Sequence, residues 1–277
     1  MGNLSTPNSV QKLQTALHAK AKAEAGYRFY ALYDKIYRED ILAFAYAHCR
    51  SNKGAPGVDG QDFADIEAYG VERWLSELAL ALKQESYKPD PIRRVYIPKP
   101  NGKLRPLGIS TVRDRVAMTA ATLVLGPIFE ADLPHELYAY RAERNAQQAV
   151  TEVEEQMFRG HPDVVDADLA DYFGSIPHAE LIKSVARRVV DRRVLHLIKQ
   201  WLDCTVEETD KRGRKTRTTG AKDTGRGIPQ GSPISPLLAN VYMRRFVLAW
   251  GLFNFCDKSN TLGWKPCPAR LPAIASF

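Results

Sequence analysis

Apolar residues recur at helical spacing in two stretches near the start of the chain. In the first, residues 11–50, the spacing predicts helix, and Gly26 predicts a break within it. Its apolar positions are Leu13, Leu17, Phe29, Leu32 and Ile36. The second stretch predicts a helix with one apolar stripe, formed by Val71, Trp74, Leu75, Leu78 and Leu82.

A change of pattern follows, from helical spacing to short apolar segments. Residues 92–97 and 104–109 are rich in β-branched and apolar residues and predict two strands. Between them, Asn101-Gly102 favours a tight hairpin turn, because both residue types tolerate a positive φ. We therefore expect an antiparallel hairpin here.

Capping residues, periodicity and a proline predict three further helices. Thr111 and Asp114 resemble a capping box at the start of a helix over residues 112–131. Residues 146–158 carry an amphipathic pattern that a glycine ends. Residues 234–250 follow a proline, which suits the first turn of a helix.

The remaining elements are mixed in kind. Residues 164–169, Val-Val-Asp-Ala-Asp-Leu, predict a short buried strand, and a helix is expected from about His178. Residues 203–226 predict a polar hairpin with a basic tip. Since helices and strands do not alternate regularly, the pattern favours the α+β class.

Composition and charge narrow the class of protein. Hydrophobic residues make up 44% of the 277 residues, which is typical of a globular chain. Lys and Arg outnumber Asp and Glu by 39 to 32, giving a net charge of +7 and a pI near 9.2. This surplus favours a polyanionic partner such as nucleic acid, although a solvated basic surface would explain it equally well.

The spacing of the cysteines and the lengths of the apolar runs indicate the cellular location of the protein. The four cysteines have neither metal-ligand nor disulfide spacing; they are Cys49, Cys204, Cys256 and Cys267. We therefore expect free thiols and a cytoplasmic location. The N-terminus has no apolar core of the signal-peptide type, and no run of about 18 apolar residues predicts a membrane span.

The first candidate for chemistry is an acidic segment that ends in an aromatic pair, Asp168-Leu169-Ala170-Asp171-Tyr172-Phe173. A carboxylate at a strand end followed by aromatic residues is typical of a polymerase palm. Phosphoryl transfer there uses two Mg²⁺ ions, and Mg²⁺ prefers oxygen ligands. Asp166 and Asp171 compete with Asp168 for this role, and a surface acid that caps the turn is the alternative interpretation.

The second candidate is the segment 227–240, Gly-Ile-Pro-Gln-Gly-Ser-Pro followed by a helical pattern. Its prolines and glycines predict a loop that leads into a helix, and Gly231 permits close approach of the backbone. Such a loop could lie against a base pair or a template. A buried structural turn is the other interpretation.

Cationic residues supply the remaining candidates. Lys99, Lys103 and Arg105 surround the predicted hairpin turn and could hold a triphosphate, or could form a solvated basic hairpin. Arg141 and Arg144 come just before the next predicted helix, where either could bind phosphate or belong to a capped helix start.

In their order along the chain, these segments resemble the motifs of reverse transcriptases encoded by group II introns, also called intron maturases. The resemblance covers roughly residues 30–250. The matching blocks are the N-terminal extension motif at 52–60, the fingers motif at 99–109, a second block at 138–145 and two catalytic blocks at 168–173 and 227–240.

The resemblance implies a fold and a division into domains. The fold is α+β, comprising the fingers and a partial palm of a right-hand polymerase. The expected domains are a helical N-terminal extension at 1–50, the fingers and partial palm at 51–250, and an unrelated, disordered tail at 251–277.

The resemblance also implies roles for individual residues and identifies partners. Lys99 and Arg105 would contact the triphosphate, and Asp168, with the carbonyl of Leu169, would bind Mg²⁺. Phe173 would act as a steric gate against a 2′-hydroxyl. Gln230 and Gly231 would lie near the incoming nucleotide and the template. The implied partners are an intron RNA template, a DNA primer or target, and deoxynucleoside triphosphates.

One departure from the family pattern changes the expectation for this chain. Family members continue to a Tyr-Ala-Asp-Asp or Phe-Ala-Asp-Asp hairpin, whereas the only carboxylate side chain after Asp223 is that of Asp257. We therefore expect a truncated form with negligible polymerase activity, exposed sheet edges and poor solubility.

Two alternatives remain for the function. The missing aspartate pair and the net charge of +7 also fit a non-catalytic RNA-binding module. An RNA-directed RNA polymerase would share the palm, but Phe173 argues against it, because an aromatic gate disfavours ribonucleotides. The basic hairpin around Lys211, Arg212, Arg214, Lys215 and Arg217 would contact intron RNA, or would be a solvated loop.

Overall fold

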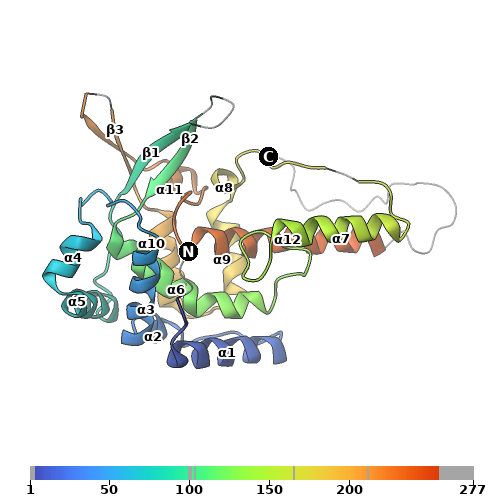
Figure 1. Ribbon diagram of the computed structural model, residues 1–277, viewed down its shortest axis with the longest axis horizontal. Helices are drawn as coiled ribbons and strands as arrows, with labels where there is room; N and C mark the ends of the chain where they lie inside the picture. The colour runs from blue at the N-terminus through green and yellow to red at the C-terminus, as the bar shows by residue number, and fades with distance from the viewer. Residues whose placement is uncertain (1–3, 99–101, 103, 165, 211, 256–277) are drawn as a thin grey trace.

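A layer of helices forms the base of the molecule in the computed structural model, which describes residues 4–98, 102, 104–164, 166–210 and 212–255 (Figure 1). The first helices confirm the predicted break near Gly26. They are α1 (Asn8–Ala23), α2 (Tyr33–Ile36) and α3 (Glu39–Ser51). Between α1 and α2 the chain pairs with a distant segment, since the Phe29 amide donates to the Arg188 carbonyl at 2.7 Å.

The centre of the core is α6 (Val112–Glu130), which is buried along most of its length and contacts α1, α2, α3 and α12. Thr111 caps it, accepting a hydrogen bond from the Asp114 amide at 3.2 Å. The reciprocal half of the predicted capping box is absent. The Asp114 carboxylate instead accepts from the Tyr87 hydroxyl at 2.6 Å and the Asp90 amide at 3.0 Å, which ties the chain before the sheet to the core helix.

A four-stranded sheet of order β2-β1-β3-β4 lies above the helices (Figure 1). Strands β1 (Ile92–Pro98) and β2 (Leu104–Ile109) form the predicted antiparallel hairpin. Strand β3 (Val206–Thr209) joins β1 in parallel and forms the predicted second hairpin with β4 (Lys215–Thr218). The two hairpins therefore share one sheet, which the sequence pattern did not predict.

The other helices agree with the predicted α+β class. The helices predicted over 146–158, from His178 and over 234–250 are all present, the last extending to residue 255. The remaining bounds are α4 (Phe63–Tyr69), α5 (Val71–Lys83), α7 (Ala146–Phe158), α8 (Tyr172–Ser175), α9 (His178–Ala186), α10 (Arg192–Leu202), α11 (Gly220–Thr224) and α12 (Ser235–Phe255). No helix in the described ranges is long and apolar enough to cross a membrane.

The strand predicted over residues 164–169 is wrong. Its described residues have irregular backbone and exposed side chains, with Val164 62% exposed. A buried strand needs a neighbour to pair with its N–H and C=O groups. None of the four strands in the described sheet pairs with this segment, so its apolar composition alone does not make it a strand.

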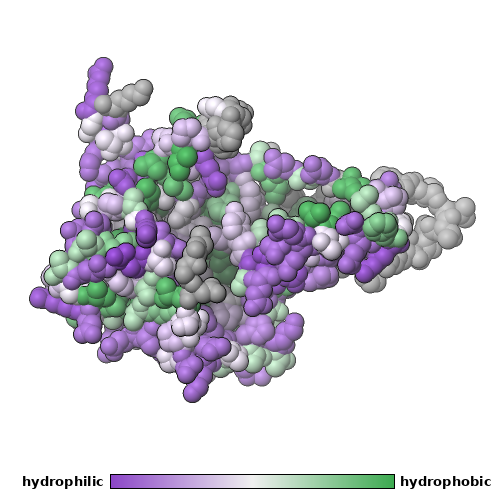
Figure 2. Space-filling view, in the orientation of Figure 1, coloured by the Kyte–Doolittle hydropathy of each residue, from purple (hydrophilic) through white to green (hydrophobic). Residues whose placement is uncertain are grey.

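Helix α7 projects away from the sheet, and apolar surface gathers over it (Figures 1 and 2). It has no buried residue, and Val150 and Phe158 are 67% and 84% exposed. A hollow of about 420 Å³ lies beside it, lined in part by Val153 and Met157.

The predicted domain boundary at residue 250 falls within α12, and residues 256–277 of the predicted tail lie outside the described residues.

Candidate nucleotide site at the edge of the sheet

The loop 227–234 lies against strand β2 and completes that edge of the sheet. The Gly108 amide donates to the Gln230 carbonyl at 2.7 Å. Gly231 has φ of +106°, and a Cβ there would lie 2.5 Å from the Gly108 carbonyl oxygen. Since real Cβ atoms do not approach backbone so closely, glycine at this position allows the loop to contact the strand.

Arg105 and Gln230 meet at this edge through their side chains. Arg105 Nε donates to Gln230 Oε1 at 3.4 Å, a long contact between largely exposed groups. Arg105 pairs with Ile97 across the β1–β2 hairpin, so it lies near the end of the described strand. A weak contact of this kind is readily exchanged for stronger, charge-assisted hydrogen bonds to an anionic ligand.

Phe173 is brought to the same loop by its backbone. The Ile228 amide donates to the Phe173 carbonyl at 2.8 Å, only two residues from Gln230. The Phe173 ring is half-buried, and its centroid lies 6.1 Å from that of Tyr140 and 5.9 Å from that of Tyr172. An aromatic side chain, an arginine and a glutamine amide therefore belong to one connected group of segments.

His178 holds this loop, and sequence reasoning missed it. Its Nε2 lies 2.7 Å from the Gly227 carbonyl oxygen, and its Nδ1 lies 3.6 Å from the Asp203 carboxylate. Its backbone amide donates to the Gly225 carbonyl at 2.8 Å. The only signal in the sequence was a helix start at this position, which carries no information about a partner almost fifty residues away.

The turn that leads into α12 is fixed by serines. Ser235 Oγ donates to the Pro229 carbonyl at 2.8 Å, and the Ser235 side chain is buried. Ser232 is buried as well, and its hydroxyl has no hydrogen-bond partner among the described residues. The loop is thus a rigid entrance to the helix, as its Pro-Gln-Gly-Ser-Pro sequence led us to expect.

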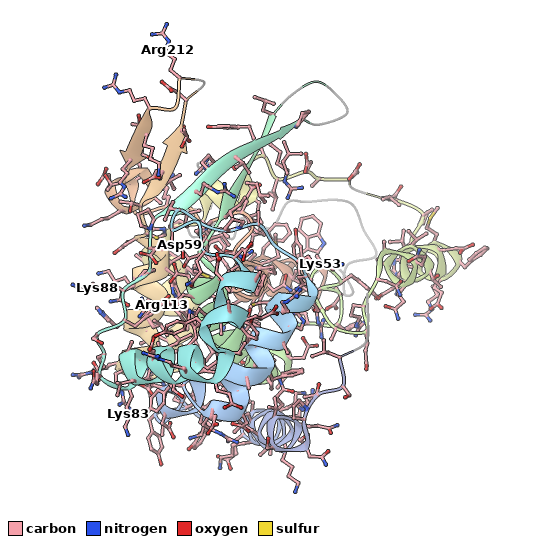
Figure 3. All side chains as sticks on the ribbon, turned by 60° about the vertical axis from the view of Figure 1, so that its left-hand side comes forward. Lys53, Asp59, Lys83, Lys88, Arg113 and Arg212 are labelled. Carbon is pink, nitrogen blue, oxygen red and sulfur yellow. The ribbon has the colours of Figure 1, made fainter. Side chains whose placement is uncertain are left out.

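The loop 52–60 lies against the start of α6, beneath the sheet. A Cβ on Gly57 would lie 2.6 Å from Thr111 Cα, so this glycine allows backbone contact. Asp59 is near the centre of the face shown in Figure 3, and burial raises the pKa of its carboxyl. The loop therefore supports the strand-to-helix junction that follows β2.

The two arginines of the block 138–145 have different environments. The Arg141 side chain is 7% exposed and binds the Glu130 carboxylate and the Pro134 carbonyl. Arg144 instead lies over the Tyr138 ring, 5.1 Å from its centroid. Asn145 forms a full capping box for α7. These contacts give Arg141 a structural role, so it is not a phosphate ligand in this structure.

The predicted metal ligands lie in an exposed, irregular segment. Asp168 is exposed and Leu169 is 37% exposed, both in the irregular segment before α8. Asp171 has a left-handed φ of +46°, and its carboxylate lies against Gly174. Within the described part of the chain, no group of three or more His, Cys, Asp or Glu residues could hold a metal ion.

Two predicted cations cannot be placed, because Lys99 and Lys103 lie outside the described residues.

On the hairpin face opposite Arg105, a cleft of about 380 Å³ is lined by residues that include Arg94, Pro106 and Cys204. The Cys204 thiol donates to the Asp90 carbonyl at 2.9 Å, and burial raises its pKa to about 12. A thiol in this state is not a nucleophile near neutral pH.

Comparison with known proteins identifies relatives that match most of the chain. Residues 97–256 match the family model described as reverse transcriptase (RNA-dependent DNA polymerase). The protein YkfC of Escherichia coli (strain K12) is 36% identical over 251 residues, and LtrA, a group II intron-encoded protein of Lactococcus lactis subsp. cremoris, is 32% identical over 225 residues. The matches span 86% and 79% of this chain, but only 61% and 35% of those proteins.

A likeness to a solved structure extends over a similar part of the chain. In the partial Cas6-RT-Cas1–Cas2 complex, a chain aligns with a TM-score of 0.48 and 25% identity, covering 80% of this chain and 35% of that chain. A putative intron protein of Saccharomyces cerevisiae, from COX1/OXI3 intron 1, is 29% identical over 206 residues. That match spans 74% of this chain and 23% of the intron protein.

Proposed function

Because the chain belongs to the reverse transcriptase (RNA-dependent DNA polymerase) family, we propose that it forms the fingers and part of the palm of an RNA-directed DNA polymerase of the group II intron type. The observation that carries this proposal is the side-chain contact of Arg105 with Gln230, on a loop whose Ile228 amide donates to the Phe173 carbonyl. The proposed partners are an intron RNA template, a DNA primer or target, and deoxynucleoside triphosphates.

Each of the three residues has a proposed task in holding the incoming nucleotide. Arg105 binds the triphosphate through its planar guanidinium, together with Lys99. Gln230 gives up its long contact with Arg105 and contacts the nucleotide instead. Gly231 keeps the loop close to β2. The Phe173 ring excludes a 2′-hydroxyl and so selects deoxynucleotides.

Asp168 and the Leu169 carbonyl are proposed as ligands of Mg²⁺, which would neutralise charge during phosphoryl transfer. Mg²⁺ commonly uses one or two carboxylates and completes its shell with substrate phosphates and water.

Nucleotide binding by the purified chain tests the proposal. Isothermal titration with dTTP in the presence of Mg²⁺ should give an affinity that Arg105→Ala weakens by about 10- to 100-fold, the expected effect of one charge-assisted contact. Arg73→Ala is the matched control, because Arg73 is an exposed arginine on α5. Phe173→Val should raise the affinity for UTP towards that for dTTP.

Two outcomes would contradict this assignment. If Arg105→Ala and Arg73→Ala bind dTTP equally well, Arg105 does not hold the triphosphate. If Phe173→Val leaves the ratio of dTTP to UTP affinity unchanged, Phe173 is not the gate. Primer extension by the chain alone is expected to stay at background, because the sequence after Asp223 contains no Asp-Asp pair of the family pattern.

A non-catalytic RNA-binding module is the second candidate function. The exposure of Asp168 and the net charge of +7 favour it. Under this alternative the chain would bind RNA with a steep salt dependence but would show no specific affinity for deoxynucleoside triphosphates. The titration described above separates the two candidates.

A cytoplasmic location completes the proposal. The two cysteines in the described ranges, Cys49 and Cys204, are free thiols, and burial raises the pKa of each. Unpaired cysteines are typical of a reducing compartment. Labelling of the native protein with a thiol reagent should leave both unreacted until the chain unfolds.

A further inference from the structure

The segment 203–227, which contains the β3–β4 hairpin and α11, begins and ends at the side chain of His178. This histidine is the first residue of α9, and its side chain is 11% exposed. At the start of the segment, the Asp203 carboxylate lies 3.6 Å from His178 Nδ1. At its end, the Gly227 carbonyl oxygen lies 2.7 Å from Nε2, and the Gly225 carbonyl accepts from the His178 amide at 2.8 Å. One imidazole ring therefore joins both ends of the segment.

The backbone at Gly227 leads directly into the candidate nucleotide site. Its amide donates to the Ile176 carbonyl at 2.9 Å. Gly227 has φ of +96°, and a Cβ there would lie 3.3 Å from the Gly174 carbonyl oxygen. Gln230, whose side chain contacts Arg105, follows three residues later. The position of the Gly227 carbonyl therefore helps to determine where Gln230 lies.

Both ring nitrogens of His178 face acceptors, the Gly227 carbonyl and the Asp203 carboxylate. A neutral imidazole carries one N–H, whereas the imidazolium donates from both nitrogens. If the ring were neutral with its proton on Nε2, Nδ1 would direct a lone pair towards the carboxylate, and two acceptors repel each other. The arrangement therefore favours the charged ring, which attracts Asp203 and donates to Gly227.

Other charged groups surround the start of α9, on the elements packed against it and on the following loop. They are Lys199 of α10, Lys222 and Asp223 of α11, Arg226 after it, and Arg244 and Arg245 of α12. Asp223 accepts from the Thr219 hydroxyl, and Arg245 pairs with Glu180. Arg244 donates to the Asp132 carbonyl, and the three other cations are exposed. Among the acidic side chains of the described ranges, Asp203 alone lies within ion-pair distance of the His178 ring.

We propose that protonated His178 is a positioning residue for the nucleotide site, which fixes the Gly227 carbonyl, and hence the Gln230 loop, through its ion pair with Asp203. The proposal rests on the proposed function for the identity of the ligand, a deoxynucleoside triphosphate. Histidines generally exchange their proton between about pH 5 and 8. The loop is therefore held more firmly at the lower end of this range, and nucleotide affinity contains a contribution that is lost as the pH rises.

Hydrogen exchange of single amides measures the loop without any ligand. The reporter is the Gly108 amide, which donates to the Gln230 carbonyl, and the reference is the Phe29 amide, which donates to the Arg188 carbonyl. His178→Leu should raise the exchange rate of the reporter relative to the reference by about 3- to 10-fold, the effect of one lost hydrogen bond. His178→Gln can still donate to the Gly227 carbonyl and should restore most of the protection.

Titration with dTTP and Mg²⁺ at about pH 5.5 and about pH 8 tests the role of the proton. The quantity compared is the ratio of the wild-type affinity to that of His178→Gln, because ionisation of the nucleotide itself cancels in this ratio. It should fall by about 3- to 10-fold at the higher pH, as expected when a partly buried ion pair is lost. In Asp203→Asn the same loss should be largely absent. The control is His196→Gln, an exposed histidine on α10, whose ratio to wild type should not depend on pH.

Two results would overturn the proposal. One is unchanged exchange of the Gly108 amide in His178→Leu, with thermal unfolding showing that this variant and His178→Gln fold. The other is a dTTP affinity ratio that stays constant between the two pH values. If Arg105→Ala binds dTTP as tightly as wild type, the proposed function fails instead, and the exchange measurement still decides whether His178 holds the loop.

Discussion

At the scale of single residues, the candidate site depends on two glycines where backbone meets backbone. The Cβ that is absent from Gly231 would contact the Gly108 carbonyl, and the Cβ absent from Gly108 would lie 3.2 Å from the Gln230 carbonyl oxygen. Both glycines occur in segments whose prolines and glycines were visible in the sequence. The partner of each glycine was not visible, because Gln230 and Gly108 are far apart along the chain.

The substitution Gly231→Ala should destabilise the fold and the site together. It combines a left-handed φ with a backbone clash, so we expect a loss of roughly 2–4 kcal/mol in the free energy of unfolding. Chemical denaturation measures this loss. Gly213→Ala is the control, because its φ is +79° but no atom lies within 4 Å of the Cβ that would be added. Equal losses in the two variants would show that φ alone matters.

At the scale of elements, sequence periodicity predicted most helices and both hairpins because these elements are determined locally. Helical spacing, a proline in the first helical turn or a glycine in a turn acts within a few residues. The strand predicted over 164–169 failed because a strand requires a partner that no local pattern can supply. The predicted capping box failed for a similar reason, because the Asp114 carboxylate accepts a hydrogen bond from the distant Tyr87 instead.

The contact of α10 with the N-terminal helices depends on one carboxylate. Asp191 accepts hydrogen bonds from the Leu32 and Tyr33 amides at 2.9 Å each, and from the Arg193 amide at 3.1 Å. Its side chain is 3% exposed. It therefore caps α10 and also fixes the start of α2.

The substitution Asp191→Ala leaves these buried amides without an acceptor. We expect it to cost about 3 kcal/mol in the free energy of unfolding, since each unsatisfied buried donor is destabilising. Urea denaturation of the variant measures this cost. The control is Asp34→Ala, which removes a half-exposed carboxylate whose ion pair with Lys35 is at the surface. A loss below 1 kcal/mol for Asp191→Ala would contradict the assigned role.

At the scale of the whole molecule, buried ionisable groups shape the response to pH. Burial raises the pKa of Asp114 to about 6, and the hydrogen bonds from Tyr87 and Asp90 only partly oppose this. For Asp191 burial also acts to raise the pKa, but hydrogen bonds from three backbone amides leave it below its ordinary value. The two groups therefore act in opposite directions.

Ionisation of Asp114 should lower the free energy of unfolding as the pH rises. Because its pKa is higher in the folded than in the unfolded chain, the folded state binds more protons between about pH 4 and 6, and stability falls through that window. The free energy of unfolding of Asp114→Asn, relative to that of wild type, should therefore increase by up to about 3 kcal/mol between pH 4 and 7. Thermal unfolding of both proteins at each pH measures the difference. A difference that does not change with pH would rule out this effect.

The long-range link between Leu32 and Asp191 has a consequence for how the chain is made. The two residues are 159 positions apart. Strand β1 likewise cannot pair with β3 until β3 has been synthesised. At a synthesis rate of about 5–20 residues per second, the N-terminal segment leaves the ribosome roughly 10–30 s before its partner exists. During vectorial synthesis the residues around Phe29 and Leu32 are therefore a nascent surface that a chaperone can bind, and slow codons before residue 191 would lengthen its exposure.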